Sequence, residues 1–541
     1  MTKKSVGIIL AAAMLFPARL LAAPAVPAPG ESLPAPRGEG NPLTNEMEIE
    51  AQSSGGERFK LNSVRVEHEG LRLSDEKLIG IFSHLTGREI SAIELGEGIS
   101  ALTRYAREKG YPAATAYVPS QTAADGNLTV AIAPGRLGKI RIENESGLKD
   151  HVAMGILAGL HEGEIIKGRI LETALRNLRD LSGVEAVGVL SPGDGEGTSD
   201  LTVKIAKGKE TSLIVYSENY GSRSAGRYRY GLQGEIGNIF GTGGKLNLGT
   251  LISNKDQHGC NISLEIPTGH SATRRGMGFS RSDYELGAGL EELGAKGITN
   301  TYSVFGRTPI LATAQSSLEL TYGYGYRAIT DEMTKFDFSW KKHSHILNLG
   351  LSGAEHHGMT HMTYSLGLHT GTLVPDSEAA DELGRLGDTT GRFTKGTIDI
   401  TAVQLLGKRF DILGKLSGQK AASNLDSSEH IYLGGARGVR AYPQGEASGD
   451  EGLLGTLELR CHAPAEGLTF SAYLDAGHVA ISKSGGDGNM TLKGWGVAVS
   501  YARPGDWFAR LDYARRIGGD ELMSEDAKAH GRIWFTAGKV F

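Results

Sequence analysis

Arg440 lies in a long glycine-rich segment between two segments whose composition is typical of strands. The residues at 433–442 are Leu-Gly-Gly-Ala-Arg-Gly-Val-Arg-Ala-Tyr, and Gly-Asp-Glu-Gly follows at 449–452. An arginine side chain stays charged, and its planar guanidinium donates two parallel hydrogen bonds to a carboxylate. The pattern therefore predicts a loop inserted between strands of a β-barrel, with an arginine that is a candidate part of a channel.

The segment 362–369 alternates apolar and polar side chains with a period of two. Met362, Tyr364, Leu366 and Leu368 alternate with Thr363, Ser365, Gly367 and His369. This alternation is expected of a strand between lipid and a wet lumen. Only 39% of the residues are hydrophobic, and after the first twenty-five no apolar run reaches the roughly eighteen residues of a transmembrane helix. A closed barrel is the remaining way for this chain to cross a membrane.

Other classes of function find little support. The 541 residues include 57 basic and 62 acidic side chains, a net charge of −5 without a basic tract, so nucleic acid is not an expected partner. Segment 241–246 is similar to a phosphate loop, but Leu246 replaces the required hydroxyl residue. His356, His357 and His361 lack the carboxylates or cysteines of a metal site, and no catalytic triad pattern occurs. We expect no enzyme activity, no metal and no cofactor.

The first 25 residues have the order of a secretory signal peptide. Lys3 and Lys4 precede the apolar stretch 6–16, and Ala-Pro-Ala at 23–25 matches a cleavage site of small residues. We therefore expect 1–25 to be a signal peptide and the mature chain to leave the cytoplasm.

Residues 26–57 are rich in proline and glycine, which disfavours a continuous helix or strand. They are expected to form a linker. A short helix at 44–52 is conceivable within it, because Thr44 could cap the helix and acidic residues would lie near its N-terminus.

Two mixed units, at 58–135 and 136–208, follow the linker, and each is predicted to have the order strand, helix, helix, strand, strand. In the first unit the expected strands include 61–67 and 128–133, and the expected helices are 74–86 and 93–109. In the second unit the strands are 137–142, 184–190 and 200–205, and the helices are 149–158 and 167–181.

These two units resemble the polypeptide-transport-associated (POTRA) domains of two-partner secretion transporters of the haemolysin-activator family. In the first unit the matching residues are Gly110, Tyr111, Pro112, Val118, Pro119, Ser120, Gln121, Gly126 and Leu128. In the second they are Arg169, Leu171, Leu178, Leu181, Gly183, Val184, Pro192, Gly193, Gly197, Asp200 and Leu201. Further matches at 218–222, 226–229 and 238–241 open the C-terminal region. The resemblance implies two POTRA domains before a transmembrane β-barrel of sixteen antiparallel strands at 209–541, a length that would also divide into about sixteen strands of 9 to 11 residues with their loops.

The resemblance also implies a role for the glycine-rich loop. In the family, such a loop carries a Val-Arg-Gly-aromatic motif, folds into the lumen and places its arginine against an aspartate of the inner wall. The corresponding residues here are Gly435, Val439, Arg440, Tyr442, Tyr473 and Asp475. Period two in 470–480 points Tyr473 and Asp475 to the same, inner, face. Ala441 replaces the family glycine, and if that glycine has positive φ, alanine would strain the loop by about 1 kcal/mol or more.

The chain ends on an aromatic residue. Phe541 follows a strand in which Ile533, Phe535 and Ala537 share one face. Such an end resembles the signal that outer-membrane barrel assembly machinery reads.

The resemblance implies a transporter in the outer membrane, with its POTRA domains in the periplasm. It would recognise a large unfolded exoprotein of adhesin, haemolysin or toxin type and export it across the lipid bilayer, without nucleotide hydrolysis. An insertase of the same superfamily and a passive porin remain alternatives. The identity of the client, the POTRA edge that binds it, a plug helix in the linker and the oligomeric state stay open.

Overall fold

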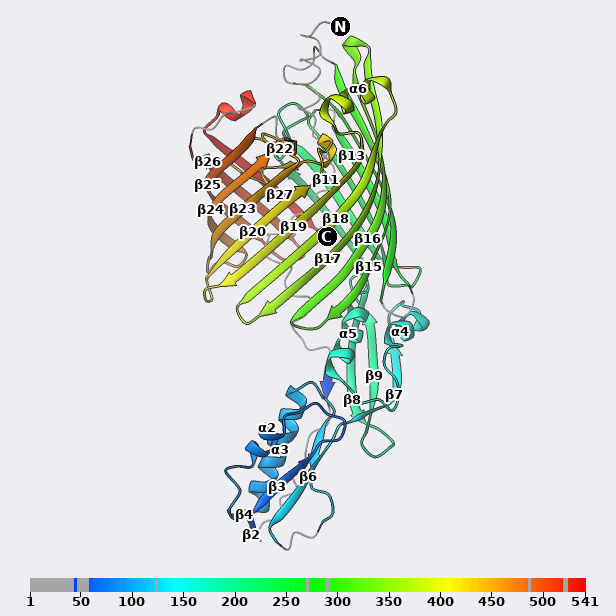
Figure 1. Ribbon diagram of the computed structural model, residues 1–541, viewed down its shortest axis with the longest axis vertical. Coiled ribbons are helices and arrows are strands. Elements are labelled where there is room, and N and C mark those ends of the chain that lie inside the picture. The colour runs from blue at the N-terminus through cyan, green and yellow to red at the C-terminus, as the bar shows by residue number, and fades with distance from the viewer. Residues whose placement is uncertain are drawn as a thin grey trace.

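The computed structural model describes residues 43–45, 58–121, 125–255, 257–268, 272–287, 292, 294–484, 488–518 and 524–541. The chain forms a barrel and two small domains that extend in a row from one end of it (Figure 1). The expected signal peptide, 1–25, lies outside the described residues.

Sixteen antiparallel strands close the barrel, each paired with the next along the chain and the last paired with the first, which confirms the predicted fold. Its first eight strands are β10 (Thr211–Glu218), β11 (Arg229–Ile239), β12 (Gly244–Ser253), β13 (His258–Pro267), β14 (Arg274–Glu285), β15 (Ala295–Ala312), β16 (Ser316–Met333) and β17 (Phe338–His357). The other eight are β18 (Thr360–Pro375), β19 (Gly391–Leu405), β20 (Phe410–Ala421), β23 (Glu451–His462), β24 (Leu468–Ala480), β25 (Asn489–Ala502), β26 (Trp507–Arg516) and β27 (Gly531–Val540).

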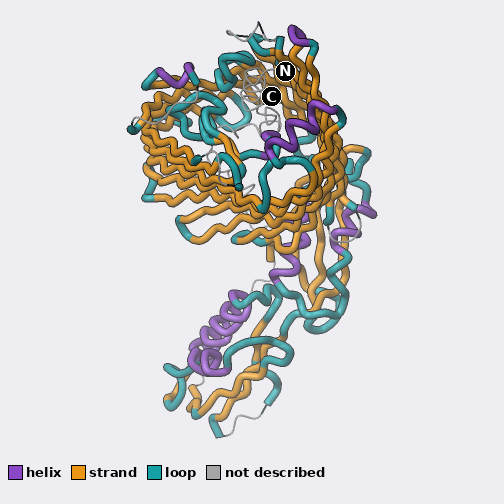
Figure 2. Tube along the Cα trace, turned by 45° about the horizontal axis from the view of Figure 1, so that its top comes forward, coloured by secondary structure: helices purple, strands orange, loops and turns teal. Residues whose placement is uncertain are grey.

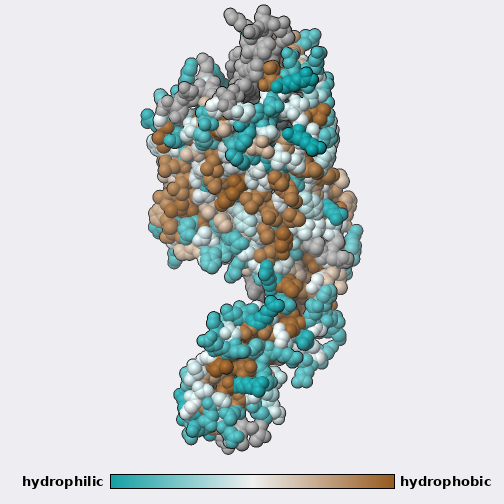
Figure 3. All heavy atoms as spheres, in the orientation of Figure 1, coloured by the Kyte–Doolittle hydropathy of each residue, from teal (hydrophilic) through white to brown (hydrophobic). Residues whose placement is uncertain are grey.

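The barrel strands alternate as the sequence pattern predicts. On β17, Leu347 and Leu349 lie on the outer face and are 58% and 52% exposed, whereas Ile346, the residue before Leu347, points inward and is buried. Leu366 and Leu368 of β18 are likewise exposed on the outer face. Figure 3 shows hydrophobic residues gathered over the strands, between more polar ends of the barrel. This outer surface suits a lipid environment. Among the described residues, no helix is long and apolar enough to cross a membrane.

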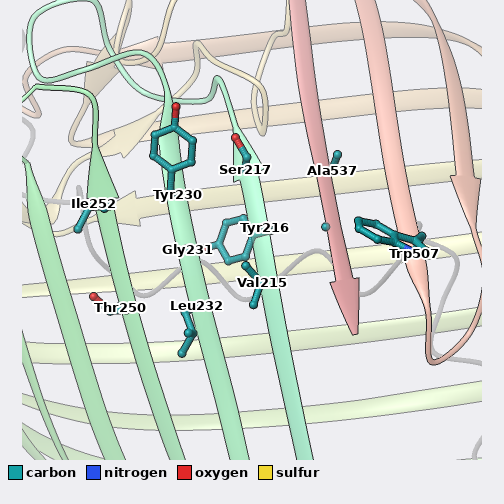
Figure 4. A pocket seen from close by; sticks show the side chains of 11 residues that line it. Val215, Tyr216, Ser217, Tyr230, Gly231, Leu232, Thr250, Ile252, Trp507 and Ala537 are labelled. Atoms are coloured by element: carbon teal, nitrogen blue, oxygen red, sulfur yellow. The ribbon is translucent and has the colours of Figure 1, made fainter. Parts of the chain in front are cut away.

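The seam that closes the barrel is short. β10 and β27 pair only from Ile214 to Glu218 and from Thr536 to Val540. On the lumen side, the ring of Tyr216 lies over Gly231, where any side chain would collide with it. On the outer face, an apolar pocket of about 450 Å³ lies beside the seam, with Trp507 at one side (Figure 4). The closing strands therefore meet through few main-chain pairs.

The first N-terminal domain has two short sheets. Its strands are β2 (Arg58–Leu61), β3 (Ser63–Glu67), β4 (Arg88–Ser91), β5 (Thr115–Tyr117) and β6 (Asn127–Ala133), and its helices are α2 (Asp75–Ile81) and α3 (Ala92–Glu108). β3, β6 and β5 form one sheet, and β2 pairs with β4. The helix expected at 93–109 is confirmed, and a reciprocal capping box of Ser91 and Glu94 begins it.

The prediction for this domain gave one helix too long and missed two short strands. The helix expected at 74–86 ends at Ile81, because the next residues form turns up to Gly87, which has a φ of +84° that favours glycine. The main-chain N–H of Gly87 donates to Leu61 O. This contact brings together β2 and β4, two short strands that the sequence pattern did not reveal.

The second N-terminal domain follows the predicted order. It contains β7 (Arg136–Asn144), α4 (Asp150–Leu157), α5 (Gly168–Arg179), β8 (Val184–Pro192) and β9 (Thr198–Lys207). Leu171, Leu175 and Leu178 recur along one face of α5 and pack on Leu201 and Val203 of the sheet.

A fourth strand of this sheet comes from the N-terminal segment. β1 (Leu43–Asn45) pairs in parallel with β8. Thr44 and Asn45, the first two residues of the conceivable helix at 44–52, are extended and pair with Val189 and Leu190 of β8. Residues 46–57 lie outside the described residues.

Candidate functional site in the barrel lumen

The glycine-rich loop connects β20 to β23 at the end of the barrel away from the N-terminal domains (Figure 1). Figure 2, with this end turned forward, shows loop segments lying inside the ring of strands. Two short strands, β21 (Ile431–Tyr432) and β22 (Ser448–Gly449), pair with each other at the base of the loop. Between them the chain packs against the wall, in a buried cluster that includes Val439, Tyr442 and Leu492.

Close main-chain packing shapes the tip of this loop. Gly435 has a φ of +113°, which favours glycine, and its carbonyl accepts from the N–H of Gly438 at 3.0 Å. A Cβ at Gly438 would collide with the carbonyl oxygen of Leu433. The N–H of Val439 donates to that same carbonyl at 2.6 Å. The chain folds back on itself here and presents Arg440 to the wall.

Arg440 and Asp475 are brought together. Arg440 Nε donates to Asp475 Oδ2 at 2.9 Å, and Arg440 Nη2 donates to Asp475 Oδ1 at 2.8 Å. The main-chain N–H of Arg440 also donates to Oδ2, at 3.1 Å. Both side chains are buried, and Thr456 of β23 donates a further hydrogen bond to Asp475. This is the bidentate geometry that suits a guanidinium and a carboxylate.

Three further charged residues complete the cluster, and sequence reasoning missed them. Arg440 Nη1 donates to Glu458 of β23 and to Asp512 of β26, each at 3.2 Å. Arg510 of β26 bridges the same two carboxylates, with ion-pair distances of 3.1 Å and 2.9 Å. Glu458 and Asp512 are each 2% exposed. The sequence does place charged residues at inward-facing positions of these strands. It does not show which of them lie side by side, because that depends on the register of β23 to β26.

Two aromatic residues hold Arg440 from other directions. The ring centroid of Tyr473 lies 3.2 Å from Arg440 Cζ, a cation–π contact. The indole Nε1 of Trp534, on β27, donates to the carbonyl oxygen of Arg440 at 2.6 Å. Tyr442, two residues on, is fully buried in the apolar cluster of the loop. Strands β23 to β27 thus all take part in holding this segment.

The backbone strain that a positive φ would cause at Ala441 does not occur. Ala441 is not among the residues with positive φ, so its backbone is accessible to any amino acid. Its Cβ points at Gly494 of β25, where an added Cβ would lie only 2.6 Å away. A glycine on the wall therefore makes room for alanine in the loop.

A second set of ion pairs holds the start of the loop against another part of the wall. Glu429 pairs with Arg327 of β16 at 2.6 Å and with Lys395 of β19 at 2.8 Å. Asp426 pairs with Lys342 of β17 at 2.7 Å. Burial raises the pKa of Asp426, but the adjacent ammonium of Lys342 outweighs this and lowers the pKa to about 2. The loop is thus fixed by charge at two places.

The residues of the POTRA motif make internal contacts. Tyr111 is buried, and its hydroxyl accepts from the N–H of Arg72 at 2.9 Å. The amide of Gln121 donates to Thr129 O at 2.6 Å and accepts from Thr129 N at 2.8 Å, as a strand partner would. The carbonyl of Pro119 accepts from the same amide.

Pro112 of the same motif lies at the junction of the two domains. Its Cδ would be 3.4 Å from a Cβ added at Gly168, the first residue of α5. The N–H of Gly168 donates to Gly110 O at 2.8 Å.

Phe541 extends the closing seam. Its N–H donates to Leu213 O at 2.8 Å, and its carbonyl accepts from Leu213 N at 3.3 Å. Its side chain is 58% exposed. Phe535 and Ala537 of the last strand alternate with the buried Trp534 and Thr536, as predicted.

Two small α+β domains in front of a closed barrel, with a loop held in its lumen by a buried arginine, define a POTRA-containing outer-membrane barrel. The family model of the haemolysin secretion/activation proteins ShlB/FhaC/HecB matches residues 197–501. The model of the ShlB-type POTRA domain matches residues 59–135.

Curated relatives and solved structures agree with this class. The chain is 25% identical over 520 residues to the heme/hemopexin transporter protein HuxB of Haemophilus influenzae, which covers 94% of this chain and 91% of that protein. It is 23% identical over 477 residues to the outer membrane transporter CdiB of Dickeya dadantii, covering 84% and 82%. The structure of CdiB from Escherichia coli superposes with a TM-score of 0.69 at 20% identity and covers 92% of each chain.

The chain belongs to the ShlB/FhaC/HecB family of haemolysin secretion/activation proteins, because the family model matches more than half of it. It is a two-partner secretion transporter of the outer membrane that exports a partner exoprotein, and it is not an enzyme. BamA from Haemophilus ducreyi, with a TM-score of 0.54 and 16% identity, shares the fold alone. The family match favours secretion over the insertase alternative.

Proposed function

We propose that the POTRA domains recognise an unfolded segment of a large exoprotein in the periplasm, and that this client passes through the lumen beside the glycine-rich loop. The client would be of adhesin, haemolysin or toxin type. Support comes from the small sheets of the two POTRA domains outside the barrel, whose edges can accept an extended chain by β-augmentation.

The observation that carries the proposal is the buried contact of Arg440 with Asp475. Its removal would leave Asp475, Glu458 and Asp512 buried with one arginine in place of two, which costs on the order of 3 to 5 kcal/mol. The loop would then leave its position at β23 to β27. We infer that the contact holds the loop in the conformation that is competent for transport, with Gly435, Val439 and Tyr442 shaping the segment and Tyr473 stacking on the guanidinium.

The test compares Arg440→Ala with Arg440→Lys in cells that produce the transporter and its client. Arg440→Ala should lower the secreted client while barrel abundance stays normal. Arg440→Lys keeps the charge but loses the bidentate geometry, so partial secretion is expected. Secretion at the wild-type level by Arg440→Ala, at normal abundance, would reject this role of the loop.

Export would not need a nucleotide. The sequence has no complete phosphate-loop pattern, and folding of the client outside the cell can draw the chain outward, because each buried apolar Å² contributes about 25 cal/mol. A client variant that cannot fold should therefore be exported more slowly. Export of that variant at the full rate would count against this source of energy.

Phe541 is proposed to guide insertion of the barrel by the barrel assembly machinery. Its exposed ring at the end of the closing strand supports this idea. Removal of Phe541 should lower the amount of barrel in the outer membrane, whereas Phe541→Tyr should not. Equal amounts for both variants would contradict it.

The client itself would be found by comparing secreted and outer-membrane proteins with and without this chain. Loss of one large secreted protein is the expected result. Depletion of many other barrels would support an insertase, and no change in either fraction would support a passive porin.

A further inference from the structure

The apolar pocket beside the seam lies on the lipid-facing side of the barrel. Its walls come from five neighbouring strands, β26, β27, β10, β11 and β12, so it crosses the joint between the last strand and the first. Figure 4 shows Trp507 on one side of the two closing strands, and Leu232 and Ile252 on the other. Its volume of about 450 Å³ falls within the range of about 300 to 1,000 Å³ that is usual for pockets that hold a small molecule.

Small residues open this pocket at the seam. Ala537 of β27 pairs in register with Ser217 of β10, and both line the pocket. The next outward positions of β27 carry the longer side chains of Phe535 and Lys539. Gly231 lies in the floor, where the ring of Tyr216 covers it from the lumen side. A larger side chain at position 537 would therefore fill the opening.

Two opposite charges lie at one edge of the pocket. Lys539 Nζ lies 4.0 Å from Asp506 Oδ1, and the two side chains are 34% and 38% exposed. The same ammonium lies 5.2 Å from the ring centroid of Trp507 and 5.0 Å from that of Phe541. The main-chain N–H of Val540 donates to Asp506 O at 2.9 Å, which holds the turn that carries Asp506 against the last strand. Each charge has room for a second partner.

This edge is the periplasmic edge of the barrel. β10 begins at Thr211, shortly after the last strand of the second POTRA domain ends at Lys207. Phe541 pairs with Leu213 near that start. Because the POTRA domains lie in the periplasm, Lys539 lies at the level of the headgroups of the inner leaflet, where lysine and tryptophan are typical anchors.

We propose that this pocket binds one phospholipid of the inner leaflet whose headgroup carries a primary ammonium, as phosphatidylethanolamine does. One acyl chain lies in the apolar pocket across the seam. The phosphate contacts Lys539, and the ammonium of the headgroup contacts Asp506.

The charged pair decides which lipid is selected. An acyl chain gains little hydrophobic free energy when it moves from the bilayer into an apolar pocket, so selection falls to the headgroup and to the fit of the chain. A phosphate and a primary ammonium complement Lys539 and Asp506 in charge, and both contacts are charge-assisted hydrogen bonds. Phosphatidylglycerol brings no cation to Asp506, and the quaternary ammonium of phosphatidylcholine has no N–H to donate.

A lipid bound here would support the closed barrel from outside. β27 and β10 share only five main-chain pairs. An acyl chain in the pocket would touch Trp507 and Ala537 on one side of the seam and Val215 and Leu232 on the other. Because only the closed barrel has these two sides together, the lipid should stabilise the closed form.

Photocrosslinking of the full-length transporter in nanodiscs tests the proposal. The probe is phosphatidylethanolamine with a diazirine near the end of one acyl chain, present as a minor component among phosphatidylcholine. Labelled peptides should come mainly from β10, β11 and β27, and much less from the outer face of β18. Lys539→Gln should lower labelling at the seam about fivefold, because an ionic contact is lost. Equal labelling around the whole barrel would mean ordinary bilayer contact and would overturn the proposal.

Ala537→Leu fills the pocket without a change of charge and should lower labelling at the seam about fivefold or more. Ala402→Leu is the matched control, because Ala402 pairs with Met362 on the outer face of β19, away from the seam. Lys341→Gln, at the extracellular end of β17, is the control for Lys539→Gln. Both controls should label as the unmodified transporter does. Unchanged labelling of Ala537→Leu would show that the chain does not lie in the pocket.

Competition by unlabelled lipids tests the headgroup. Phosphatidylethanolamine should displace the probe about threefold better than phosphatidylcholine or phosphatidylglycerol does, and Asp506→Asn should remove this preference. Equal competition by all three lipids against the unmodified transporter would overturn the assignment of the ammonium to Asp506.

Thermal unfolding in detergent measures the effect on the barrel. Added phosphatidylethanolamine should raise the unfolding temperature of the unmodified transporter and of Ala402→Leu more than that of Ala537→Leu, because only a lipid that binds the folded barrel stabilises it. An equal rise for all three proteins would contradict a lipid that bridges the seam.

Discussion

Trp534 of the last barrel strand donates a hydrogen bond of 2.6 Å to the main-chain carbonyl of Arg440, the residue whose side chain is held by Asp475. The position of the lumen loop is therefore coupled to the strand that closes the barrel. β27 pairs with β10 through only five residues. We infer that the loop supports the closing strand from inside.

We expect Trp534→Phe to loosen the loop while it leaves an aromatic ring on β27. The variant removes one donor and leaves the buried carbonyl of Arg440 without it, which costs about 1 to 3 kcal/mol. Resistance of the loop to added protease should fall, and the barrel should unfold at a lower temperature. Trp495→Phe, at an exposed position of β25, is the control. Unchanged protease resistance of Trp534→Phe would show that this hydrogen bond does not couple the loop to the closing strand.

In the charge cluster, Arg510→Gln should be more destabilising than Asp475→Asn. Arg510→Gln leaves Arg440 alone with three buried carboxylates, a loss on the order of 3 to 5 kcal/mol. Asp475→Asn leaves two arginines with two carboxylates, Glu458 and Asp512, so the remaining charges balance and a loss of about 1 to 3 kcal/mol is expected. Free energies of unfolding in urea, for barrels refolded into lipid, would give the order.

The control for this comparison is Arg515→Gln, because Arg515 lies exposed on the same strand as Arg510. Its free energy of unfolding should stay near that of the unmodified barrel. A larger loss for Asp475→Asn than for Arg510→Gln would show that the bidentate hydrogen bonds, and not the charge balance, dominate.

Ala441 and Gly494 should show strong coupling. Gly494→Ala alone places two Cβ atoms 2.6 Å apart and should destabilise the barrel by about 1 to 3 kcal/mol. Ala441→Gly alone should cost about 1 kcal/mol or less, because the native φ is not positive and glycine only adds freedom to the unfolded chain. The double variant should recover most of the loss of Gly494→Ala. Additive losses in this double-mutant cycle would contradict the contact.

The ion pair of Asp426 with Lys342 predicts a pH dependence at acid pH. The pKa of Asp426 is lowered to about 2 in the folded protein, below its value in the unfolded chain, so its contribution to stability is present above pH 4 or so. That contribution is about 2 kcal/mol, and it is lost as the pH falls from about 4 to about 2. Urea unfolding of the wild type and of Asp426→Asn at several pH values would measure it. The difference in free energy of unfolding between the two proteins should shrink in this pH window. A constant difference would contradict the lowered pKa of Asp426.

Much of the barrel could be predicted from local pattern. Period two along 470–480 places Asp475 and Tyr473 on the inner face, because successive side chains of a strand point to opposite sides whatever the neighbouring strand is. The same rule gave the outward face of Leu366 and Leu368. Gly435 and Gly438 likewise indicated a tightly folded loop, because glycine allows backbone conformations and close contacts that other residues do not.

Other features depended on which strands become neighbours. Glu458 and Arg510 meet Arg440 only through the register of β23 to β26, and Glu429 meets Lys395 only because the loop folds back on β19. The pairing of Thr44 with Val189 joins segments that are far apart in sequence, so no local pattern could show it. Alternation along one strand is a property of the chain, and the sequence by itself determined it. The meeting of charges across strands requires a closed barrel, and only the tertiary structure decided it.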